Sequence, residues 1–318
     1  MVLRQSTPSR RLLLLGALAL PLTACARRDG QAAGSSPTTP ASPSASSGRV
    51  DRATVTAHFS ALERKYDARL GVYAMTTGSD SGAGAGRTVA YRAGERFAFC
   101  STFKALAAAA VLHHHPLSHL DTVIPIRRAD VDSISPITEQ HIGGSMTIRQ
   151  LCDAAIRYSD GTAGNLLMRD IGGPDRLTGY LRGLGDTVSR MDQYEPALNR
   201  DRPGDLRNTT TPRALAADYR AIVLGGALPT DKRALLKEWL RRSTTGALAV
   251  RAGVPRGWTV ADKTGHGDYG RSNDVAIAWP PHGAPLVIAV MSDRHGYDAK
   301  PGQAIIADAT RYVVDMLR

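Results

Sequence analysis

The chain has 318 residues, of which 42% are hydrophobic, so it can bury a large core as one big domain or as two intergrown lobes. This composition excludes a chain that is disordered throughout. The formal net charge is +11, but the basic residues are scattered and no aromatic-flanked basic stripe or nucleic-acid-binding motif is visible. The charge therefore favours anionic small molecules or an anionic cell envelope as partners over nucleic acid.

Residues 1–24 have the pattern of an export signal. Arg10-Arg11 precedes the apolar run 12–20, which is too short to be a stable membrane anchor, and the arginine pair is typical of the twin-arginine route. The segment 22–25 resembles a bacterial lipoprotein box, in which Cys25 is lipidated and becomes the mature N-terminus. An ordinary cleaved signal with an incidental cysteine is the alternative. The expected location is the outer face of the cell membrane, as a lipoprotein, or the medium, as a secreted protein.

Residues 25–50 are rich in Ser, Pro and Ala and cannot build a core, so they predict a flexible tether. Two further cysteines, Cys100 and Cys152, lie in apolar helical patterns. An exported protein could oxidise such a pair. Because the two positions belong to separate predicted helices, we expect two free, buried thiols.

The folded body begins near residue 51 and has strands at both ends of a long helical segment. The first predicted elements are a helix over 55–66 and two strands over 69–75 and 88–91, which are joined by a glycine-rich turn over 78–86. A mostly helical stretch follows from 101 to about 240. The chain then returns to strands over 258–261, 274–279 and 286–291 and ends with a helix over 303–317. This order predicts one α/β lobe formed by residues 51–98 and 242–318, into which a helical lobe of residues 99–241 is inserted.

Ser101 and Lys104 stand three residues apart at the start of an alanine-rich helix. Residues at this spacing share a helix face, so the Lys104 amine can reach the Ser101 hydroxyl, while the amides of the helix N-terminus favour an anion there. A nearby amine and a site that favours an anion are what a serine needs in order to be acylated. A capping serine beside a solvated lysine is the alternative, and the pair alone does not exclude it.

Three further motifs carry polar groups, and each of them is weak alone. Ser159-Asp160-Gly161 lies at a junction between two predicted helices, where the serine hydroxyl can project into a cleft. Glu195 and Asn199 offer a carboxylate and an amide that can hold one water between them. The run 262–267 leaves a strand with small residues, which let a backbone edge approach a ligand and present amides to an oxyanion.

The four motifs, in this order, resemble those of the class A serine β-lactamases, and the resemblance covers about residues 51–318. Gly161, the preceding pair 157–158 and the run 267–270 are similar to the actinobacterial (mycobacterial and streptomycete-like) branch. The resemblance implies an α/β (α+β) fold of the β-lactamase/transpeptidase type, with an antiparallel sheet flanked by terminal helices and an inserted all-helical lobe. It implies hydrolysis of β-lactam antibiotics through an acyl-enzyme.

The resemblance also implies a role for each motif. Ser101 would attack the lactam carbonyl, and the backbone amides of Ser101 and His266 would hold the oxyanion. Either Lys104 or Glu195 would take the serine proton, a choice that the sequence leaves open. Ser159, tuned by Lys263, would protonate the leaving nitrogen, and Glu195 would activate the deacylating water. The expected substrate-binding residues are Asn199, Gly161, Thr264, Gly265, His266 and Ile134. No cofactor or metal is implied, and a monomer is expected.

The sequence departs from the family where many members carry an arginine for the substrate carboxylate. Ala249 and Ser272 occupy the two places, and the neighbouring Arg251 and Arg271 are out of register. Carboxylate recognition is therefore expected to rest on Lys263, Thr264 and His266. The run His113-His114-His115 is not a good metal site, because consecutive helical side chains point about 100° apart.

Two other functions remain open at this level. A D-alanyl-D-alanine peptidase shares the Ser-x-x-Lys and Lys-Thr-Gly motifs but lacks a deacylating carboxylate, so Glu195 and Asn199 argue against it. A β-lactam sensor would deacylate slowly and would usually carry a signalling partner or a membrane helix. Neither signature is visible in the sequence.

Overall fold

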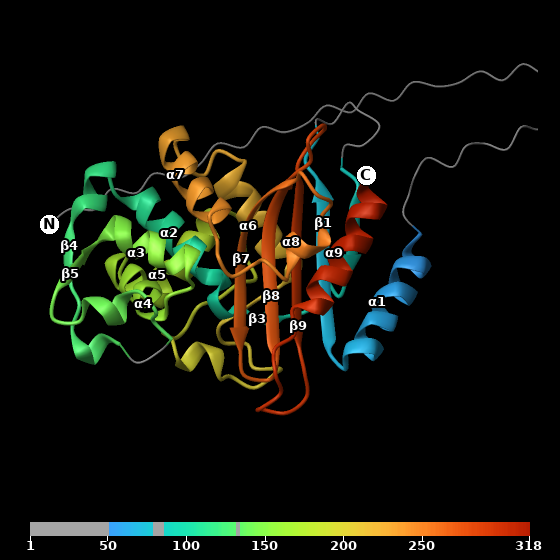
Figure 1. The fold of residues 1–318 in the computed structure, drawn as a ribbon, viewed down its shortest axis with the longest axis horizontal. Coiled ribbons are helices and arrows are strands. Elements are labelled where there is room, and N and C mark those ends of the chain that lie inside the picture. Colours follow the sequence, from blue (N-terminus) through green and yellow to red (C-terminus); the bar gives the residue numbers. More distant parts are fainter. Residues whose placement is uncertain (1–50, 79–85, 132–133) are drawn as a thin grey trace, which may run out of the picture. The chain divides into compact units, whose positions relative to one another are not determined.

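The computed structural model describes residues 51–78, 86–131 and 134–318. Over these residues the main sheet has five strands in the order β2-β1-β9-β8-β7, and each neighbouring pair is antiparallel (Figure 1). The strand bounds are β1 Arg69–Thr76, β2 Thr88–Tyr91, β7 Thr259–Gly267, β8 Arg271–Trp279 and β9 Leu286–Asp293. The predicted antiparallel sheet, built from both ends of the chain, is confirmed.

Both faces of this sheet are covered, which explains why its central strands are continuous apolar runs. Side chains alternate between the faces along each strand. Val275 and Ile277 of β8 belong to a core shared with the inserted helices, whereas Ala276 and Ala278 belong to a second core under the terminal helices. The second core is closed by α1 (Arg52–Tyr66), α8 (Val250–Gly253) and α9 (Ala304–Leu317), which lie on one side of the sheet in Figure 1.

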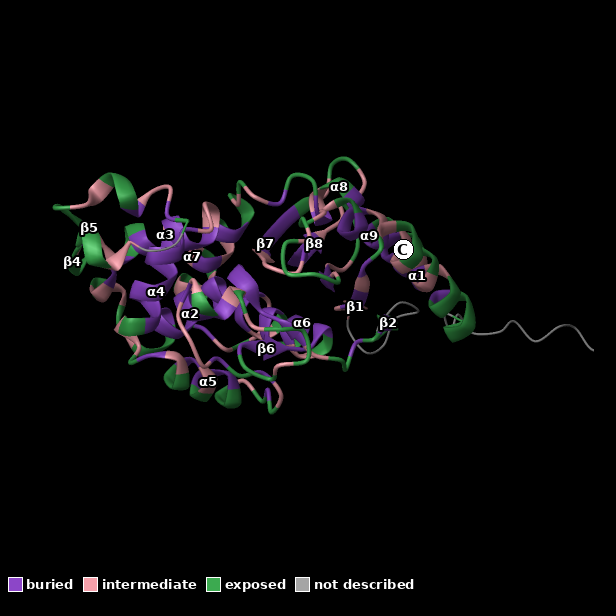
Figure 2. Cartoon of the chain, turned by 90° about the horizontal axis from the view of Figure 1, so that it is seen from below, coloured by how far each residue is buried: buried purple, intermediate pink, exposed green. Residues whose placement is uncertain are grey.

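The inserted segment packs around one central helix. Helix α2 (Phe103–His114) is buried from Phe103 to Leu112 and contacts the surrounding helices α3 to α7. Its run of alanines permits this, since small side chains let several helices approach one axis. Figure 2 shows buried residues concentrated on α2, α3 and α4. The surrounding helices are α3 Ile148–Arg157, α4 Gly161–Asp170, α5 Pro174–Gly183, α6 Pro212–Val223 and α7 Thr230–Arg241.

The inserted segment differs from the predicted all-helical lobe in two respects. It contains short strands, because β4 (Val123–Pro125) pairs with β5 (Ser145–Thr147), and β6 (Thr209–Thr210) pairs with β3 (Phe97–Ala98). The β-branched residues of these segments favour such pairing. In addition, α6 lies against strands β1, β8 and β9, so part of the insertion covers the sheet directly.

Several sequence predictions fall outside the described residues. They are the export signal 1–24, the tether 25–50 with Cys25, and most of the turn predicted over 78–86. In the part of the chain that is described, none of the helices combines the length and the hydrophobicity that a membrane span requires.

Candidate active site

Ser101 lies on a buried turn that leads into the central helix. It is the middle residue of a short 3₁₀ helix, Cys100–Thr102, and Lys104 stands in the first turn of α2. Cys100 has a φ of 45°, a left-handed conformation that is uncommon for a residue with a side chain and that tends to be found at functional sites. Lys104 Nζ donates to Ser101 Oγ at 2.8 Å, so the predicted contact is confirmed. Ser101 is 8% exposed and Lys104 0%.

The ammonium of Lys104 is surrounded by acceptors, which offset the cost of burying its charge. Lys104 Nζ lies 2.9 Å from Glu195 Oε1 and donates to the Ser159 carbonyl at 2.7 Å. Ser101 Oγ donates to the same Glu195 oxygen at 3.1 Å. Gly164 of α4 makes room for the lysine, because a Cβ there would lie 2.8 Å from Lys104 Cε. Nucleophile, lysine and carboxylate therefore form one hydrogen-bonded group.

Ser159 stands between α3 and α4 and has a φ of 59°. The neighbouring Asp160 stabilises this junction, because it caps α4 through Ala163 N at 2.8 Å and accepts from Thr138 Oγ1 at 2.9 Å. Gly161 donates its amide to the carbonyl of Ile134 at 2.8 Å. Gly161 thus has neither a side chain nor a free amide to offer a ligand. The Ile134 side chain, 87% exposed, lies at this same junction.

Lys263 connects the strand β7 to Ser159. Its Nζ donates to Ser159 Oγ and to the carbonyl of Thr264, both at 2.9 Å. Burial lowers the pKa of Lys263 to about 7, and the charge of Lys104 acts in the same direction. The adjacent carboxyl of Asp262 accepts from Arg251 Nε at 2.6 Å, so Arg251 is paired with a protein carboxylate.

The strand β7 extends beyond its predicted end at Ala261 and reaches Gly267, paired with β8 as far as Arg271. Gly265 permits this edge to lie against the nucleophile turn. A Cβ at Gly265 would lie 3.0 Å from the carbonyl oxygen of Phe99 and 3.2 Å from the amide nitrogen of Ser101. Sequence reasoning ended the strand early because lysine, threonine, glycine and histidine do not continue its apolar run.

Glu195 is oriented by a residue that the sequence analysis missed. Asn165 of α4 donates Nδ2 to the Glu195 carbonyl at 2.8 Å and accepts from the Glu195 amide at 2.9 Å. This two-way contact fixes the backbone from which the carboxylate projects toward Ser101. No local signal could have revealed it, because Asn165 contacts the backbone of a residue 30 positions away.

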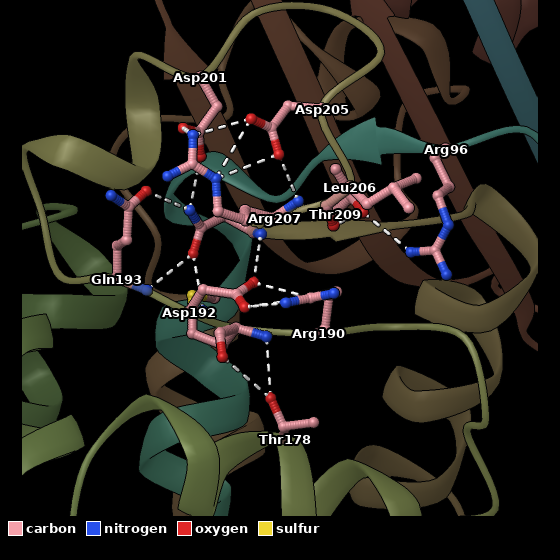
Figure 3. Close-up of polar contacts among 12 residues, drawn as sticks. Arg96, Thr178, Arg190, Asp192, Gln193, Asp201, Asp205, Leu206, Arg207 and Thr209 are labelled. Atoms are coloured by element: carbon pink, nitrogen blue, oxygen red, sulfur yellow. Dashed lines mark hydrogen bonds and ion pairs between the residues drawn. The ribbon is translucent and has the colours of Figure 1, made fainter.

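The segment 190–209, which carries Glu195 and Asn199, is closed by side-chain hydrogen bonds (Figure 3). Asn208 accepts from the amides of Asp192 at 2.9 Å and Gln193 at 3.0 Å, and it donates to Asp201 Oδ2 at 2.6 Å. Arg207, on the outside, pairs with Asp201 at 2.9 Å. Asn208 therefore joins the two ends of the segment to its middle.

Arg271 is a second support of this segment. It is buried, and its guanidinium donates to the carbonyl of Asn199 at 2.8 Å and to the carbonyl of Asp201. These contacts engage its guanidinium with the backbone of the segment 190–209. Asn199 Oδ1 is a buried atom with no hydrogen-bond partner among the described residues.

The region expected to bind a carboxylate contains hydroxyl and imidazole groups. Thr264 Oγ1 lies 2.6 Å from Thr245 Oγ1, and His266 Nε2 lies 3.1 Å from the side-chain nitrogen of Gln303. Because a Gln side-chain nitrogen only donates, the His266 nitrogen accepts, and burial also lowers the pKa of this imidazole. His266 is therefore a neutral residue at pH 7, which weakens its expected role as a charge partner for a carboxylate.

The two places that lack an arginine are both buried. Ala249 belongs to the core between the sheet and α9, and Ser272 Oγ accepts from the amide of Gly302 at 2.9 Å. An arginine introduced at Ala249 would therefore have to displace packed core groups.

Cys100 and Cys152 are buried and free, as predicted, and burial raises the pKa of Cys100 to about 12.

Comparison with known proteins gives a consistent result. The model of the family described as Beta-lactamase enzyme family matches residues 54–317. The chain is 54% identical over 314 residues to a beta-lactamase of Mycobacterium tuberculosis, with 97% of each chain covered. It is 54% identical over 261 residues to beta-lactamase AST-1 of Nocardia asteroides, covering 81% of this chain and 82% of the relative.

A solved structure agrees with these relatives. The crystal structure of a halotolerant bacterial beta-lactamase superposes with a TM-score of 0.79 at 46% identity, and it covers 82% of this chain and 98% of that chain. The chain therefore belongs to the beta-lactamase enzyme family, in the actinobacterial class A group that its motifs resemble.

Proposed function

We propose that this protein hydrolyses β-lactam antibiotics through an acyl-enzyme on Ser101. Membership of the family supports the reaction. One geometric observation supports the mechanism: Ser101 Oγ lies within hydrogen-bond distance of Lys104 Nζ, at 2.8 Å, and of Glu195 Oε1, at 3.1 Å. A hydroxyl that contacts a carboxylate and a lysine nitrogen at the N-terminal end of a helix is suited to attack a carbonyl carbon, with Glu195 or the free amine of Lys104 as the proton acceptor.

In acylation, Ser101 Oγ forms a bond to the lactam carbonyl carbon, and the ring C–N bond breaks. The serine proton passes to Lys104 as a free amine, or to Glu195 through a water, and the two contact distances leave both routes open. The proposed oxyanion donors are the amides of Ser101 and His266. The close approach of Gly265 to the Ser101 amide supports this, because it brings the two amides to the same edge.

The departing ring nitrogen must receive a proton, and Ser159 is the proposed donor. Its hydroxyl accepts from Lys263 Nζ at 2.9 Å, so Lys263 can resupply the proton. The same ammonium is the proposed partner of the substrate carboxylate, together with the hydroxyl of Thr264. Ile134 and Gly161 would border the side chain of the substrate next to Ser159.

Deacylation needs a water and a base. Glu195 is the proposed base, and Asn199 Oδ1, buried and without a protein partner among the described residues, is a suitable second acceptor for that water. A D-alanyl-D-alanine peptidase would have no carboxylate 3.1 Å from its nucleophile. This contact is the reason to prefer rapid hydrolysis over a peptidase or a slow sensor.

The test is a chromogenic cephalosporin assay with burst kinetics on the purified protein. Multiple rapid turnovers per enzyme molecule are expected. A single burst of one equivalent followed by a negligible steady-state rate would contradict hydrolysis and would favour the sensor or the peptidase. No burst and no turnover would contradict the whole assignment.

We further propose that the protein is exported and anchored by a lipid on Cys25. The arginine pair Arg10-Arg11 and the segment 22–25 support this. Cells fed radiolabelled palmitate should label the protein, and Cys25→Ala should abolish the label and release the protein into the medium. Label that persists in the variant would refute the anchor.

A monomer is the expected form, and light scattering that gives a dimer mass would contradict it.

A further inference from the structure

A cluster of two histidines and one aspartate lies away from the proposed active site, where three elements meet. His115 follows the last residue of α2, His119 belongs to the short 3₁₀ helix Leu117–Asp121, and Asp170 is the last residue of α4. His119 Nε2 lies 3.0 Å from both Asp170 oxygens, and His115 Nε2 lies 3.6 Å from one of them. One ligand atom of each residue lies within 4.8 Å of the other two.

The two imidazoles bring their Nε2 atoms to the same carboxylate, that of Asp170. Their rings are stacked, with centroids 3.9 Å apart and an interplanar angle of 18°, so one ring must turn before the in-plane lone pairs of both Nε2 atoms can converge on one ion. Around a tetrahedral zinc ion with ligand distances of about 2.0–2.1 Å, neighbouring donor atoms lie roughly 3.3 Å apart. The three donor atoms already lie within 4.8 Å of one another, so binding requires that they move closer together and that a ring turns.

The surroundings of the cluster support metal binding in two further ways. His119 Nδ1 lies 3.4 Å from Thr122 Oγ1, so the ring nitrogen that does not face Asp170 has a partner that can fix its tautomer. The backbone of His115 is held because its carbonyl accepts from Lys232 Nζ at 2.6 Å. The side chains of His115, His119 and Asp170 are 32%, 21% and 13% exposed, so an ion can enter from solvent and still lose part of its hydration shell.

We propose that His115, His119 and Asp170 form a binding site for one zinc ion, with the fourth position taken by water. Two imidazole nitrogens and one carboxylate are ligands typical of zinc, whereas calcium and magnesium prefer oxygen ligands alone. Binding replaces the hydrogen bond between His119 and Asp170 and the 3.6 Å contact of His115 with the same carboxylate. In a neutral imidazole the proton moves from Nε2 to Nδ1, and an imidazolium releases one proton to solvent.

The position of the site in the fold defines its effect. Helix α2 carries Lys104 in its first turn, and α4 begins two residues after Ser159. His115 and Asp170 lie at the opposite, C-terminal ends of these two helices. Twelve helical residues span about 18 Å, so the ion does not touch the reacting atoms. It ties the ends of α2 and α4 together and stabilises the inserted segment. Of the run His113-His114-His115, whose helical geometry prevents it from binding an ion by itself, only the last member takes part.

The experiment is isothermal titration of the full, untagged, metal-free chain with zinc chloride. One equivalent is expected to bind with micromolar affinity. His119→Gln and Asp170→Asn, which keep size and hydrogen bonding, are expected to weaken this binding at least tenfold. His114→Gln, an exposed histidine of the same run, is the matched control and should bind as the wild type does. Absence of stoichiometric binding in the wild type, or equal binding in His119→Gln, would overturn the proposal.

A second measurement separates the site from adventitious binding. Cobalt(II) in a four-coordinate nitrogen and oxygen site absorbs visible light strongly, and this band should appear in the wild type and in His114→Gln but not in His119→Gln. Zinc should raise Tm in the same two proteins, and calcium should not. A zinc-induced Tm increase of equal size in Asp170→Asn, with circular dichroism confirming the fold, would contradict the assignment.

Discussion

The two sides of the active site are held in place by different means. Every residue from Phe97 to Leu112 is buried, so Ser101 and Lys104 stand on a turn and a helix fixed by core packing. The segment 190–209, which carries Glu195, is mostly exposed or half-buried, and its regular structure is a short 3₁₀ helix, Ala197–Asn199, before it reaches β6. Side-chain contacts from Asn165, Asn208 and Arg271 replace core packing there.

This difference separates the two half-reactions physically. Acylation uses groups set by the packed core, whereas deacylation uses a carboxylate whose position depends on a few hydrogen bonds. Loss of one such bond costs about 1–3 kcal/mol when it leaves a buried group unpaired, which is enough to move or loosen an exposed segment but not to unfold the lobe. Changes to the supports of the segment should therefore slow deacylation more than acylation.

The largest expected effect is on the nucleophile itself. Ser101→Ala should lower kcat/KM for any β-lactam by at least about 10³-fold, because the atom that forms the acyl bond is removed. Alanine fits the space, so Tm should stay within about 5 °C of the wild type. Steady-state hydrolysis of a chromogenic cephalosporin measures the loss, and activity within about tenfold of the wild type would mean that another residue is the nucleophile.

The next largest effect is on the carboxylate. Glu195→Ala should lower kcat by at least about 10²-fold while a pre-steady-state burst of about one equivalent remains, since release depends on Glu195 more than attack does. Stopped-flow absorbance measures both phases. If the burst disappears together with the steady state, Glu195 is needed for acylation as well, and the proposed division between the two sides is wrong.

A matched pair of arginines tests the support of the segment. Arg271→Met removes the buried donor to the carbonyls of Asn199 and Asp201, and it should lower kcat about tenfold with a smaller change in the acylation rate. Arg207→Met removes an exposed arginine that pairs with Asp201 and Asp205, and it should change kcat by less than about twofold. Single-turnover kinetics separates the two steps. Equal effects of the two variants, or an equal slowing of both steps in Arg271→Met, would contradict the comparison.

The smallest expected effect is a dependence of kcat/KM on pH through Lys263, which is buried on β7. The pKa of Lys263 is lowered to about 7, so its ammonium is present below that pH and is lost as the pH rises through it. For lactams with a free carboxylate, kcat/KM should fall about fivefold between pH 6.5 and 8.5, which corresponds to ~1 kcal/mol for one screened charge contact. An esterified lactam without the carboxylate is the control and should show a smaller fall, since only the supply of a proton from Lys263 to Ser159 is then affected. Equal profiles for both substrates would remove Lys263 from carboxylate recognition.

Much of this organisation could be predicted from the sequence because the signals are local. The pair Ser101 and Lys104 meets one helical turn apart, and the strands β8 and β9 are apolar runs long enough to identify. The order of strands and helices predicted one sheet built from both ends of the chain, and the resemblance to the class A serine β-lactamases implied that this sheet is antiparallel. These features depend on periodicity and spacing, which a sequence displays directly.

The features that sequence reasoning missed depend on contacts between distant segments. Asn165, Gln303 and Thr245 each act on a site residue far away in the chain, and no spacing rule connects the members of these pairs. The end of β7 was placed too early because its last residues are polar, although they are buried where β7 contacts α7 and the 3₁₀ helix Cys100–Thr102. Small strands such as β4 and β5 carry too few residues to show alternation.

The most direct test of the central claim is the location of the acyl group. Glu195→Ala incubated with excess benzylpenicillin should gain the mass of one penicillin molecule, and tandem mass spectrometry of the digest should place it on Ser101. The double variant Ser101→Ala, Glu195→Ala should gain nothing. An adduct on another residue such as Ser159, or no adduct in the single variant although the protein is folded, would contradict a mechanism that passes through Ser101 and is completed by Glu195.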